Sequence, residues 1–484
     1  MGTKINTKFV VQFGWKHVDF WKAEFDSVLT LNNLSPEDVY NEEHLTLGNK
    51  SPFLFVNFPS IDVAKQVSSR CVLITRVYQY WGHGKTDAAL HQAIKGLDPA
   101  FTASSYSEAC SWCIQVGAFG KKLKMHDQKT LRDKLAFIPF KGPVKLKEPD
   151  RTFWYLEEYT QVGVKCNTAD ERVPRCKYFL LEISSGRADL VQKYTLKKRQ
   201  FLGPTSMDTE LSFIMSNCVL ARSGSFIIDP FVGTGSLLIS AKAFGAHCVG
   251  VDIDIRILHA KRFNKTSDQF SNYDQYGFSP PCTLRADVSR RGNCLRKVPI
   301  FDGILCDPPY GVRAGARKCG SKRKTIEKIP DHKLKDHIPK TQPYHGTEVM
   351  LDLLEMAATF LVVGGRLVYF LPVERAIYTD ADIPRHECLK LVFNCEDPLG
   401  SFYSRRMITM EKTKEYPVES GGIEGKRMAY YTDGREFQQE QELTLRQKMD
   451  NKGLEKKRKT ASSAEGLVNA ASKDKKIRGT QAGK

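Results

Sequence analysis

Four aspartates in the central part of this 484-residue chain each follow a short apolar run. They are Asp229, Asp252, Asp287 and Asp307. Short apolar runs bounded by turn residues are typical of buried strands. Because ligands of open α/β sheets bind in the crevice at the carboxyl ends of the strands, we expect the four carboxylates to meet at one edge of a sheet. Such an edge could hold a cofactor and position a reacting group beside it.

The first aspartate begins a loop that leads from a strand into a helix, Asp229-Pro230-Phe231-Val232-Gly233-Thr234-Gly235-Ser236. Glycines let this loop turn tightly and approach a ligand, and the N-terminus of the helix attracts a carboxylate or phosphate. The G-x-G pattern also occurs in nucleotide-binding oxidoreductases, but Leu238 replaces their third glycine. Asp252 is spaced to bind both hydroxyls of a ribose, and Asp287 could face an adenine amino group. The predicted cofactor-binding residues are therefore Asp229, Pro230, Gly233, Gly235, Asp252 and Asp287.

The last aspartate begins the segment Asp307-Pro308-Pro309-Tyr310, whose residue types suit methyl transfer to an aromatic amine. Such an amine is a poor nucleophile because its lone pair is delocalised into the ring. The Asp307 carboxylate and the Pro308 carbonyl can accept hydrogen bonds from both amine protons, which directs the lone pair toward the methyl group. The prolines stiffen the loop, and Tyr310 offers a face on which a base can stack. These four residues are the predicted catalytic group.

Three features of the sequence have competing interpretations. A strand-to-loop turn also favours Asp, Pro and Tyr, but the three acidic strand ends before Asp307 favour the catalytic interpretation. Cys306 could support a covalent mechanism on cytosine, yet it lies within an apolar run and is expected to pack. The segment Gly82-His83-Gly84-Lys85-Thr86 resembles a phosphate-binding loop. Gln79 stands where that motif requires a glycine, so we reject it.

The cysteines indicate a reducing compartment and no metal site. Their number, 13, is odd, and most are single residues within apolar stretches, as expected of buried thiols. Cys110 and Cys113 form a C-x-x-C pair without a second pair to complete a zinc site. The formal net charge of +18 favours an anionic partner such as nucleic acid. We find no signal peptide and no run long enough to span a bilayer, and therefore expect a cytoplasmic protein with no membrane association.

Residues 196–412 alternate between strand-like and helix-like segments, which predicts a parallel sheet with helices on both faces. The expected strands are 226–228, 248–251, 282–285, 300–306 and 366–371, and the expected helices are 236–244 and 255–263. The runs 389–393 and 406–410 could close the sheet as a hairpin. We expect a mobile basic loop at 313–345. Residues 1–195 mix strands with amphipathic helices in an α+β arrangement with basic loops such as 120–124.

After residue 412 the apolar density falls, and residues 413–484 are predicted to be a disordered basic tail. The cluster Lys456-Lys457-Arg458-Lys459 is most simply a solvated tail, with a nuclear signal and a nuclear fraction as the alternative. We assign this tail no role.

At the D-P-F-x-G-x-G loop and the D-P-P-Y segment the chain resembles the class I (Rossmann-like) amino-methyltransferases. It is more specifically similar to the THUMP-containing tRNA guanine-N2 methyltransferases, which act at position ten. That resemblance depends on Lys197-Lys198-Arg199-Gln200-Phe201-Leu202-Gly203-Pro204-Thr205-Ser206-Met207-Asp208, and the segment Phe402-Tyr403-Ser404-Arg405-Arg406 adds to it. It covers most of residues 1–412.

The resemblance implies a ferredoxin-like plus THUMP module at residues 1–195 that grips the acceptor end of tRNA. It implies S-adenosylmethionine as methyl donor, held by Asp229, Gly233, Gly235 and Asp252, with Thr205, Ser206 and Asp208 beside its methionine part. The guanine would lie against Asp307 and Tyr310. A small zinc-binding activator subunit is the implied protein partner.

The residues alone indicate a methyl donor, an amine acceptor and an anionic polymer. The D-P-P-Y segment serves adenine N6 and cytosine N4 equally well, so the choice of guanine comes from the resemblance. A catalytically silent RNA-binding scaffold is the alternative from another functional class. Acidic residues at all four strand ends argue against it, because binding alone does not require Asp307.

Overall fold

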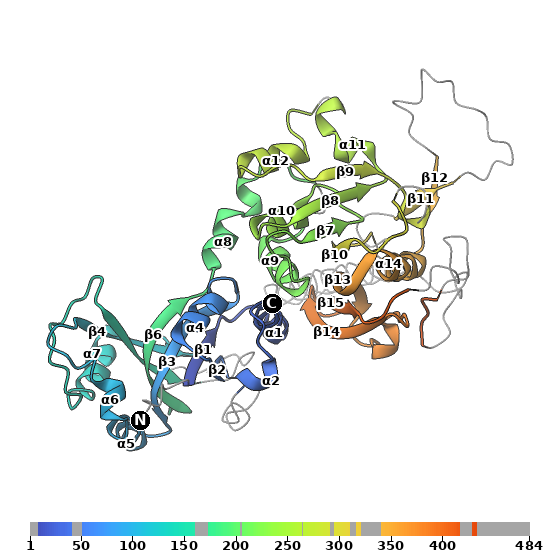
Figure 1. Cartoon of the computed structure of the whole chain (residues 1–484). Helices are drawn as coiled ribbons and strands as arrows, with labels where there is room; N and C mark the ends of the chain where they lie inside the picture. Colours follow the sequence, from blue (N-terminus) through green and yellow to red (C-terminus); the bar gives the residue numbers. More distant parts are fainter. Residues whose placement is uncertain are drawn as a thin grey trace, which may run out of the picture.

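The computed structural model describes residues 8–40, 51–159, 173–203, 206–263, 265–290, 295–309, 316–320, 340–416 and 428–432. These residues form an N-terminal α+β domain and a larger α/β domain, which lie side by side (Figure 1). No helix in these ranges has the length and apolar character needed to cross a membrane. Tyr310, Thr205 and the cluster 456–459 lie outside the described residues.

The N-terminal domain is built on one six-stranded sheet with the order β2-β1-β3-β6-β5-β4. Its strands are β1 (Lys8–Phe13), β2 (Phe53–Asn57), β3 (Ile74–Gly84), β4 (Trp112–Phe119), β5 (Arg151–Glu158) and β6 (Cys176–Ser185). The helices are α1 (Trp21–Leu31), α2 (Pro36–Val39), α4 (Ile61–Ser68), α5 (Asp87–Lys95), α6 (Pro99–Thr102), α7 (Met125–Asp133) and α8 (Ala188–Lys193), with 3-10 turns η1 (Val18–Phe20) and η2 (Leu196–Lys198). Strands β4 and β5 run parallel, and the other neighbours are antiparallel.

Strand β3 is central to this sheet, and the sequence patterns did not reveal it. Its end includes Gly82 and Gly84, part of the segment that imitates a phosphate-binding loop. A Cβ atom on Gly84 would lie 2.6 Å from the backbone nitrogen of Leu90, so the glycine lets α5 pack against the strand end. Thr86 accepts a hydrogen bond from the amide of Ala89 and caps α5. The segment is thus a strand-to-helix connection.

The α/β domain contains a seven-stranded sheet with the order β14-β15-β13-β10-β7-β8-β9. Its strands are β7 (Phe226–Asp229), β8 (His247–Asp252), β9 (Cys282–Arg285), β10 (Phe301–Cys306), β13 (Leu361–Glu374), β14 (Leu389–Pro398) and β15 (Tyr403–Lys412). The helices are α9 (Thr209–Cys218), α10 (Ser236–Ala243), α11 (Ile255–Leu258), α12 (Gln269–Gln275) and α14 (Gly346–Phe360), with 3-10 turns η3 (Ala260–Phe263), η4 (Val288–Arg290) and η5 (Asp380–Asp382). Strands β9, β8, β7, β10 and β13 run parallel, and β15 and β14 close the sheet as an antiparallel hairpin.

Successive strand residues in this sheet point into two different apolar clusters, as the pleat of a strand requires. Ile227 and Leu305 pack in the cluster that contains α9 and α10, whereas Ile228 and Ile304 pack in the cluster that contains α14. Helices therefore cover both faces, and the predicted parallel sheet is confirmed. The helix expected at 255–263 is instead interrupted after α11, because His259 leaves helical geometry and a 3-10 turn follows.

The two domains share one continuous apolar cluster, which extends from Phe9 in β1 to Met407 in β15. Helix α1 of the N-terminal domain packs against α9 of the α/β domain. At this contact the buried Glu24 accepts a hydrogen bond from Asn217 (2.7 Å), and Arg70 donates one to the same asparagine (2.8 Å). The junction therefore fixes the position of one domain against the other.

Within the predicted basic loop at 313–345, the structure describes residues 316–320 and 340–345. Strand β11 (Arg317–Cys319) pairs antiparallel with β12 (Thr341–Pro343). Residues 321–339, between them, lie outside the described part. In the segment predicted as a tail, residues 413–416 and 428–432 pack on the α/β domain, with Ala429 and Tyr431 buried beside α14. Folded chain therefore extends beyond the expected boundary at 412.

Candidate active site

A cavity of about 530 Å³ lies at the carboxyl ends of the parallel strands. Its volume is in the range of sites for cofactors and small ligands. The structure brings together most of the residues predicted to bind a cofactor or catalyse. The cavity is lined by Ser206, Asp208, Asp229, Pro230, Gly233, Asp252, Asp287, Asp307, Pro308 and Pro309 among others.

The loop after β7 is held in place by β8. The amide of Gly233 donates a hydrogen bond to the Asp252 carboxylate (3.0 Å), and the amide of Val232 donates one to the carbonyl of Val251 (2.9 Å). Gly233 has a φ of 49° and Gly235 a φ of 73°, in the left-handed region that favours glycine. Gly235 does not line the cavity. A Cβ atom there would lie 2.6 Å from the Tyr273 hydroxyl, which donates a hydrogen bond to the Gly235 carbonyl.

The carboxylates of Asp229 and Asp252 accept hydrogen bonds from backbone amides. Asp229 accepts one from Phe231 (2.9 Å), and Asp252 accepts a second one from Asp254 (2.8 Å). Burial raises the pKa of Asp229 well above its usual value, against the amide bond, and the nearby charges of Asp252 and Asp307 raise it further. Burial also raises the pKa of Asp252, although its amide bonds oppose the shift. The site is thus an acidic cavity that would be stabilised by a cationic ligand.

Asp287 lies at the wall of the cavity nearest to the β11–β12 ribbon. One carboxylate oxygen accepts hydrogen bonds from the backbone and side chain of Ser289 (2.9 and 2.7 Å), and the other accepts one from the amide of Cys319. These bonds tie the ribbon to the end of β9. They also occupy part of the carboxylate's hydrogen-bonding capacity, so the prediction that Asp287 faces an adenine amino group stays a prediction.

Asp307 follows β10 directly and faces a cation that the sequence reasoning did not assign to the site. A guanidinium nitrogen of Arg405 lies 3.8 Å from the Asp307 carboxylate. Pro308 and Pro309 continue the wall of the cavity. Cys306, the alternative nucleophile, is fully buried in the strand, and burial raises the pKa of its thiol well above the usual value. It therefore lacks the exposure and the thiolate character of a reactive cysteine.

Ser206 and Asp208 enter the cavity from the segment before α9. Ser206 lies 3.1 Å from the Thr234 hydroxyl, which links this segment to the glycine loop. Asp208 caps α9 by accepting hydrogen bonds from the amides of Glu210 (2.9 Å) and Leu211 (3.2 Å). Asp208 therefore has a structural role as the cap of α9 in addition to its predicted role in cofactor binding.

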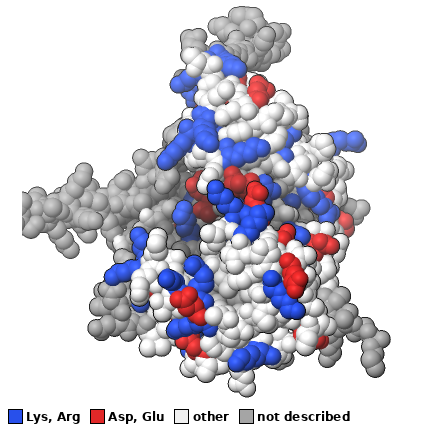
Figure 2. All heavy atoms as spheres, turned by 90° about the vertical axis from the view of Figure 1, so that its left-hand side faces the viewer, with Lys and Arg blue, Asp and Glu red and all other residues white. Residues whose placement is uncertain are grey.

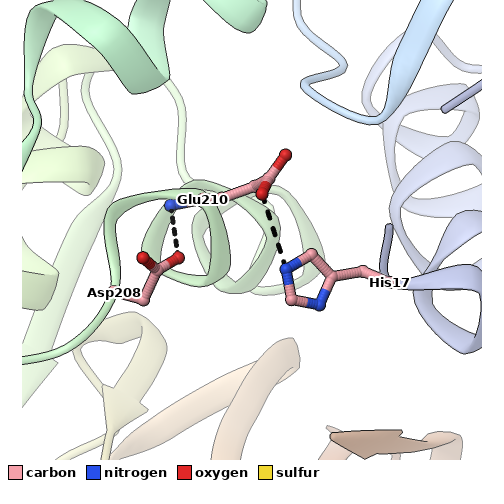
Figure 3. Close-up of side chains that lie close together, drawn as sticks. All are labelled: His17, Asp208 and Glu210. Atoms are coloured by element: carbon pink, nitrogen blue, oxygen red, sulfur yellow. Dashed lines mark hydrogen bonds and ion pairs between the residues drawn. The ribbon is translucent and has the colours of Figure 1, made fainter. Parts of the chain in front are cut away.

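Asp208 also belongs to a group of possible metal ligands that joins the two domains (Figure 3). Ligand atoms of His17, Asp208 and Glu210 all lie within 4.8 Å of one another. Each acidic group already has a partner, since Asp208 caps α9 and Glu210 lies 3.5 Å from the His17 ring nitrogen. The hydrogen bond with His17 lowers the pKa of Glu210. We interpret the group as an ion pair between domains.

Arg405, Arg317 and Tyr344 line the cavity but were not predicted as site residues. Arg405 belonged to a segment noted for its resemblance, without a role. A topological signal was present, because an antiparallel strand begins at the edge where its parallel neighbours end. The first residues of β15 therefore had to lie near Asp307. Arg317 and Tyr344 belong to the basic loop, whose pairing into a ribbon had no comparable signal.

Comparisons with known proteins agree with this geometry. Residues 7–186 match the family described as Tmrp11 THUMP N-terminal domain, and residues 197–323 match the RMKL-like methyltransferase domain. The chain is 36% identical over 439 residues to the tRNA (guanine(10)-N(2))-methyltransferase TRMT11 of Gallus gallus, covering 88% of this chain and 91% of that protein. It is 37% identical over 429 residues to the protein of that name from Homo sapiens, covering 84% and 89%.

Among solved structures, the crystal structure of TrmN from Thermus thermophilus matches with a TM-score of 0.40 and 16% identity, over 84% of this chain and 99% of that one. The sequence identities to the curated proteins extend over both domains, and the two domain matches occur in the order that the fold shows. They confirm the predicted combination of a THUMP-type module with a Rossmann-like methyltransferase domain. This chain belongs to the tRNA (guanine(10)-N(2))-methyltransferase family.

Proposed function

We propose that this protein transfers a methyl group from S-adenosylmethionine to the exocyclic N2 of a guanosine, at position ten of tRNA. The observation that carries the proposal is the meeting of Asp229, Asp252 and Asp307 in one cavity of a chain with this family membership. When bound, S-adenosylmethionine would supply an electrophilic methyl group on a sulfonium, whose sulfur keeps the electron pair of the broken C–S bond. Asp307 and the Pro308 carbonyl accept hydrogen bonds from the amine, and Asp307 takes the proton that the nitrogen loses once its lone pair has bonded to the methyl carbon.

The cavity fits this donor in charge as well as in size. Asp229 and Asp252 are buried carboxylates whose hydrogen bonds come from backbone amides, so a positively charged ligand would stabilise their ionised form. Asp252 would hold the ribose hydroxyls, since each carboxylate oxygen has a second lone pair besides the one that its amide uses. The residues Ser206 and Asp208 would lie beside the amino-acid part of the donor.

The N-terminal domain would bind the RNA. Figure 2 views the molecule from the side of this domain and shows Lys and Arg side chains spread over its face. Exposed lysines occur at both ends of the β4–β5 pair, in the loop after β4 (Lys122 and Lys124) and in the loop before β5 (Lys141, Lys145 and Lys147). Cationic side chains bind RNA by releasing counterions from phosphates. The affinity for tRNA should therefore fall steeply as the salt concentration rises.

An exposed aromatic ring adds a means of contacting bases. Trp15 is 53% exposed and stacks in parallel on the buried Phe119, with ring centroids 3.9 Å apart. The Gly14 amide donates a hydrogen bond to the Leu73 carbonyl (3.1 Å), and the Trp21 indole donates one to the Lys16 carbonyl (3.0 Å). These hydrogen bonds hold the backbone before and after Trp15. The exposed surface of the ring is available to stack on an unpaired base.

The same proposal includes a small zinc-binding activator subunit as the protein partner, and a cytoplasmic location with a nuclear fraction. Both follow from the resemblance and the composition. Fluorescence imaging of the tagged chain in cells would test the location, and co-purification would test the partner.

The decisive experiment incubates the purified chain with labelled S-adenosylmethionine and unmodified tRNA, with and without the activator subunit. Mass spectrometry of the nucleosides identifies the product. N2-methylguanosine formed with the activator and not without it supports both the chemistry and the partner. A methylated adenosine or cytidine would keep the enzyme class and overturn the guanine assignment. Measurable tRNA binding with no product in either reaction would favour the RNA-binding scaffold.

A further inference from the structure

Arg405 is the cationic side chain that the described part of the cavity presents to Asp307. It stands near the start of β15, opposite Pro372 of β13 and Asp397 of β14. Strand β13 separates β15 from β10, so the side chain reaches across one strand to the end of β10. The antiparallel direction of β15 makes this reach possible, because its first residues lie where the parallel strands finish.

The guanidinium group is fixed in place by contacts on several sides. Two of its nitrogens donate hydrogen bonds to one oxygen of the buried Asp397, at 2.6 and 3.1 Å. Its Cζ atom lies 4.3 Å from the centre of the Phe370 ring, and its third nitrogen lies 3.9 Å from the Met207 sulfur. The side chain is 11% exposed. An arginine with this many contacts keeps a single orientation, and the nitrogen nearest Met207 is the one that faces Asp307.

The next residue along the strand, Arg406, is also an arginine and differs from Arg405 in the face toward which it points. Arg406 points to the opposite face, where it donates hydrogen bonds to Asn394 (2.8 Å to the side chain) and lies against Tyr378. Its side chain is 16% exposed, similar to that of Arg405, but it does not line the cavity. The chain thus contains two adjacent, largely buried arginines of which one faces the active site.

We propose that Arg405 is a positioning residue for methyl transfer: it holds the Asp307 carboxylate at the β15 side of the cavity, in the orientation in which it accepts from the substrate amine. The inference deepens the proposed function and depends on it. Asp397 and Phe370 fix Arg405, Arg405 orients Asp307, and Asp307 orients the nitrogen lone pair. Because Asp307 acts through its geometry, a displacement of about 1 Å at the reacting centre can cost about 100-fold in rate.

The test uses the full chain together with its activator subunit and compares Arg405→Ala, Arg405→Lys and Arg406→Ala. Single-turnover rate constants are measured at saturating donor and tRNA, next to the dissociation constants for both. For Arg405→Ala we expect a rate constant about 100-fold lower with both dissociation constants nearly unchanged. Arg405→Lys should recover part of the rate, and Arg406→Ala should keep nearly all of it.

A second readout separates orientation from folding. Adding free guanidinium ions at millimolar concentration should raise the rate of Arg405→Ala and leave that of Arg406→Ala unchanged. Asp397→Asn, which keeps the arginine and weakens its anchor, should give an intermediate rate.

Three results would overturn the proposal. The first is a weaker affinity for tRNA at an unchanged rate constant, which would make Arg405 a phosphate contact. The second is an equal loss in Arg405→Ala and Arg406→Ala, which would make both arginines structural. The third is an Arg405→Ala rate constant like that of the unmodified chain. Failure of the proposed function itself would be visible separately, since the unmodified chain would then form no N2-methylguanosine.

Discussion

The two domains each contain a cluster of acidic side chains: Asp87 with Glu157 in the N-terminal domain, and the cavity aspartates in the α/β domain. The clusters differ in what neutralises their charge. In the N-terminal domain, Asp87 accepts hydrogen bonds from Lys134 (2.8 Å) and Lys177. Burial favours a higher pKa for Asp87, but the two lysines outweigh it and lower the pKa to about 2. In the α/β domain, Asp229 and Asp252 accept from backbone amides, and burial raises the pKa of both.

The contrast distinguishes a structural cluster from a ligand site. Lys134 and Lys177 belong to the chain itself, so folding alone supplies the positive charges that neutralise Asp87. The cavity carboxylates lie close to one another, with Arg405 beside Asp307. A bound cation would balance their remaining negative charge. A carboxylate whose pKa is raised in a cavity is thus a better indication of a site than a cluster of charges as such.

The sharpest test of this comparison is Asp307→Ala. The variant loses the acceptor that orients the amine, and we expect the single-turnover rate constant to fall by about 1,000-fold. The affinity for tRNA, measured by filter binding, should stay close to that of the unmodified chain. Asp87→Ala serves as the matched control in the other cluster, where we expect reduced thermal stability and a retained rate constant. A large loss of tRNA affinity in Asp307→Ala would show that Asp307 is structural.

Asp252→Asn tests the donor half of the cavity. The substitution removes a charge that would accept from the ribose, and a hydrogen bond to a charged group is worth enough to weaken donor binding by about 30-fold. Isothermal titration calorimetry with S-adenosylmethionine measures the effect. The raised pKa values of Asp229 and Asp252 add a pH dependence, because protonation removes the charge that binds the cation. Donor affinity should therefore decrease as the pH falls, and unchanged binding in Asp252→Asn would remove the ribose assignment.

Much of this site could be predicted because the sequence places its acidic residues at strand ends, and parallel strands end at one edge. Asp229, Asp252 and Asp307 each follow an apolar run that forms β7, β8 or β10. Strand β3 could not be recognised, since polar residues interrupt it and its glycines serve helix packing. Arg405 was missed although the hairpin was predicted, because the expected strand began at residue 406, whereas β15 begins at Tyr403 and its first residues lie beside the end of β13.

Trp15→Ala tests the N-terminal domain as the RNA-binding partner of the cavity. Stacking of one base on an aromatic ring is worth enough that we expect affinity for tRNA to fall by about tenfold. Trp15→Phe should fall less, because it keeps a smaller aromatic face. Ile377→Ala, which changes an exposed apolar residue of the α/β domain, is the control. Equal affinities for Trp15→Ala and Ile377→Ala would show that the ring does not contact RNA.

The junction between the domains lies outside the cavity, and the effect expected there is on stability and its pH dependence. Glu24 is fully buried at this contact, and burial raises its pKa to about 7 against the hydrogen bonds from Val72, Leu73 and Asn217. Because the pKa in the folded chain lies above the unfolded value, the folded state binds more protons between about pH 4.5 and about pH 7. The contribution of Glu24 to stability is therefore present below pH 4.5 and is lost as the pH rises through 7, in total about 3 kcal/mol.

Thermal unfolding of the unmodified chain, of Glu24→Gln and of a control variant between pH 3 and pH 8 measures this contribution. The advantage of the unmodified chain over the variant should shrink as the pH rises, because glutamine does not titrate. Glu210→Gln is the control at the same junction with the opposite sign, since His17 lowers the pKa of Glu210. Its stability should approach that of the unmodified chain as the pH falls from 4.5 through the lowered pKa of Glu210, where the carboxylate is protonated in the folded chain as well. Parallel curves for the unmodified chain and Glu24→Gln would mean that the buried carboxyl does not exchange a proton in this range, and that the junction keeps the domains in place independently of pH.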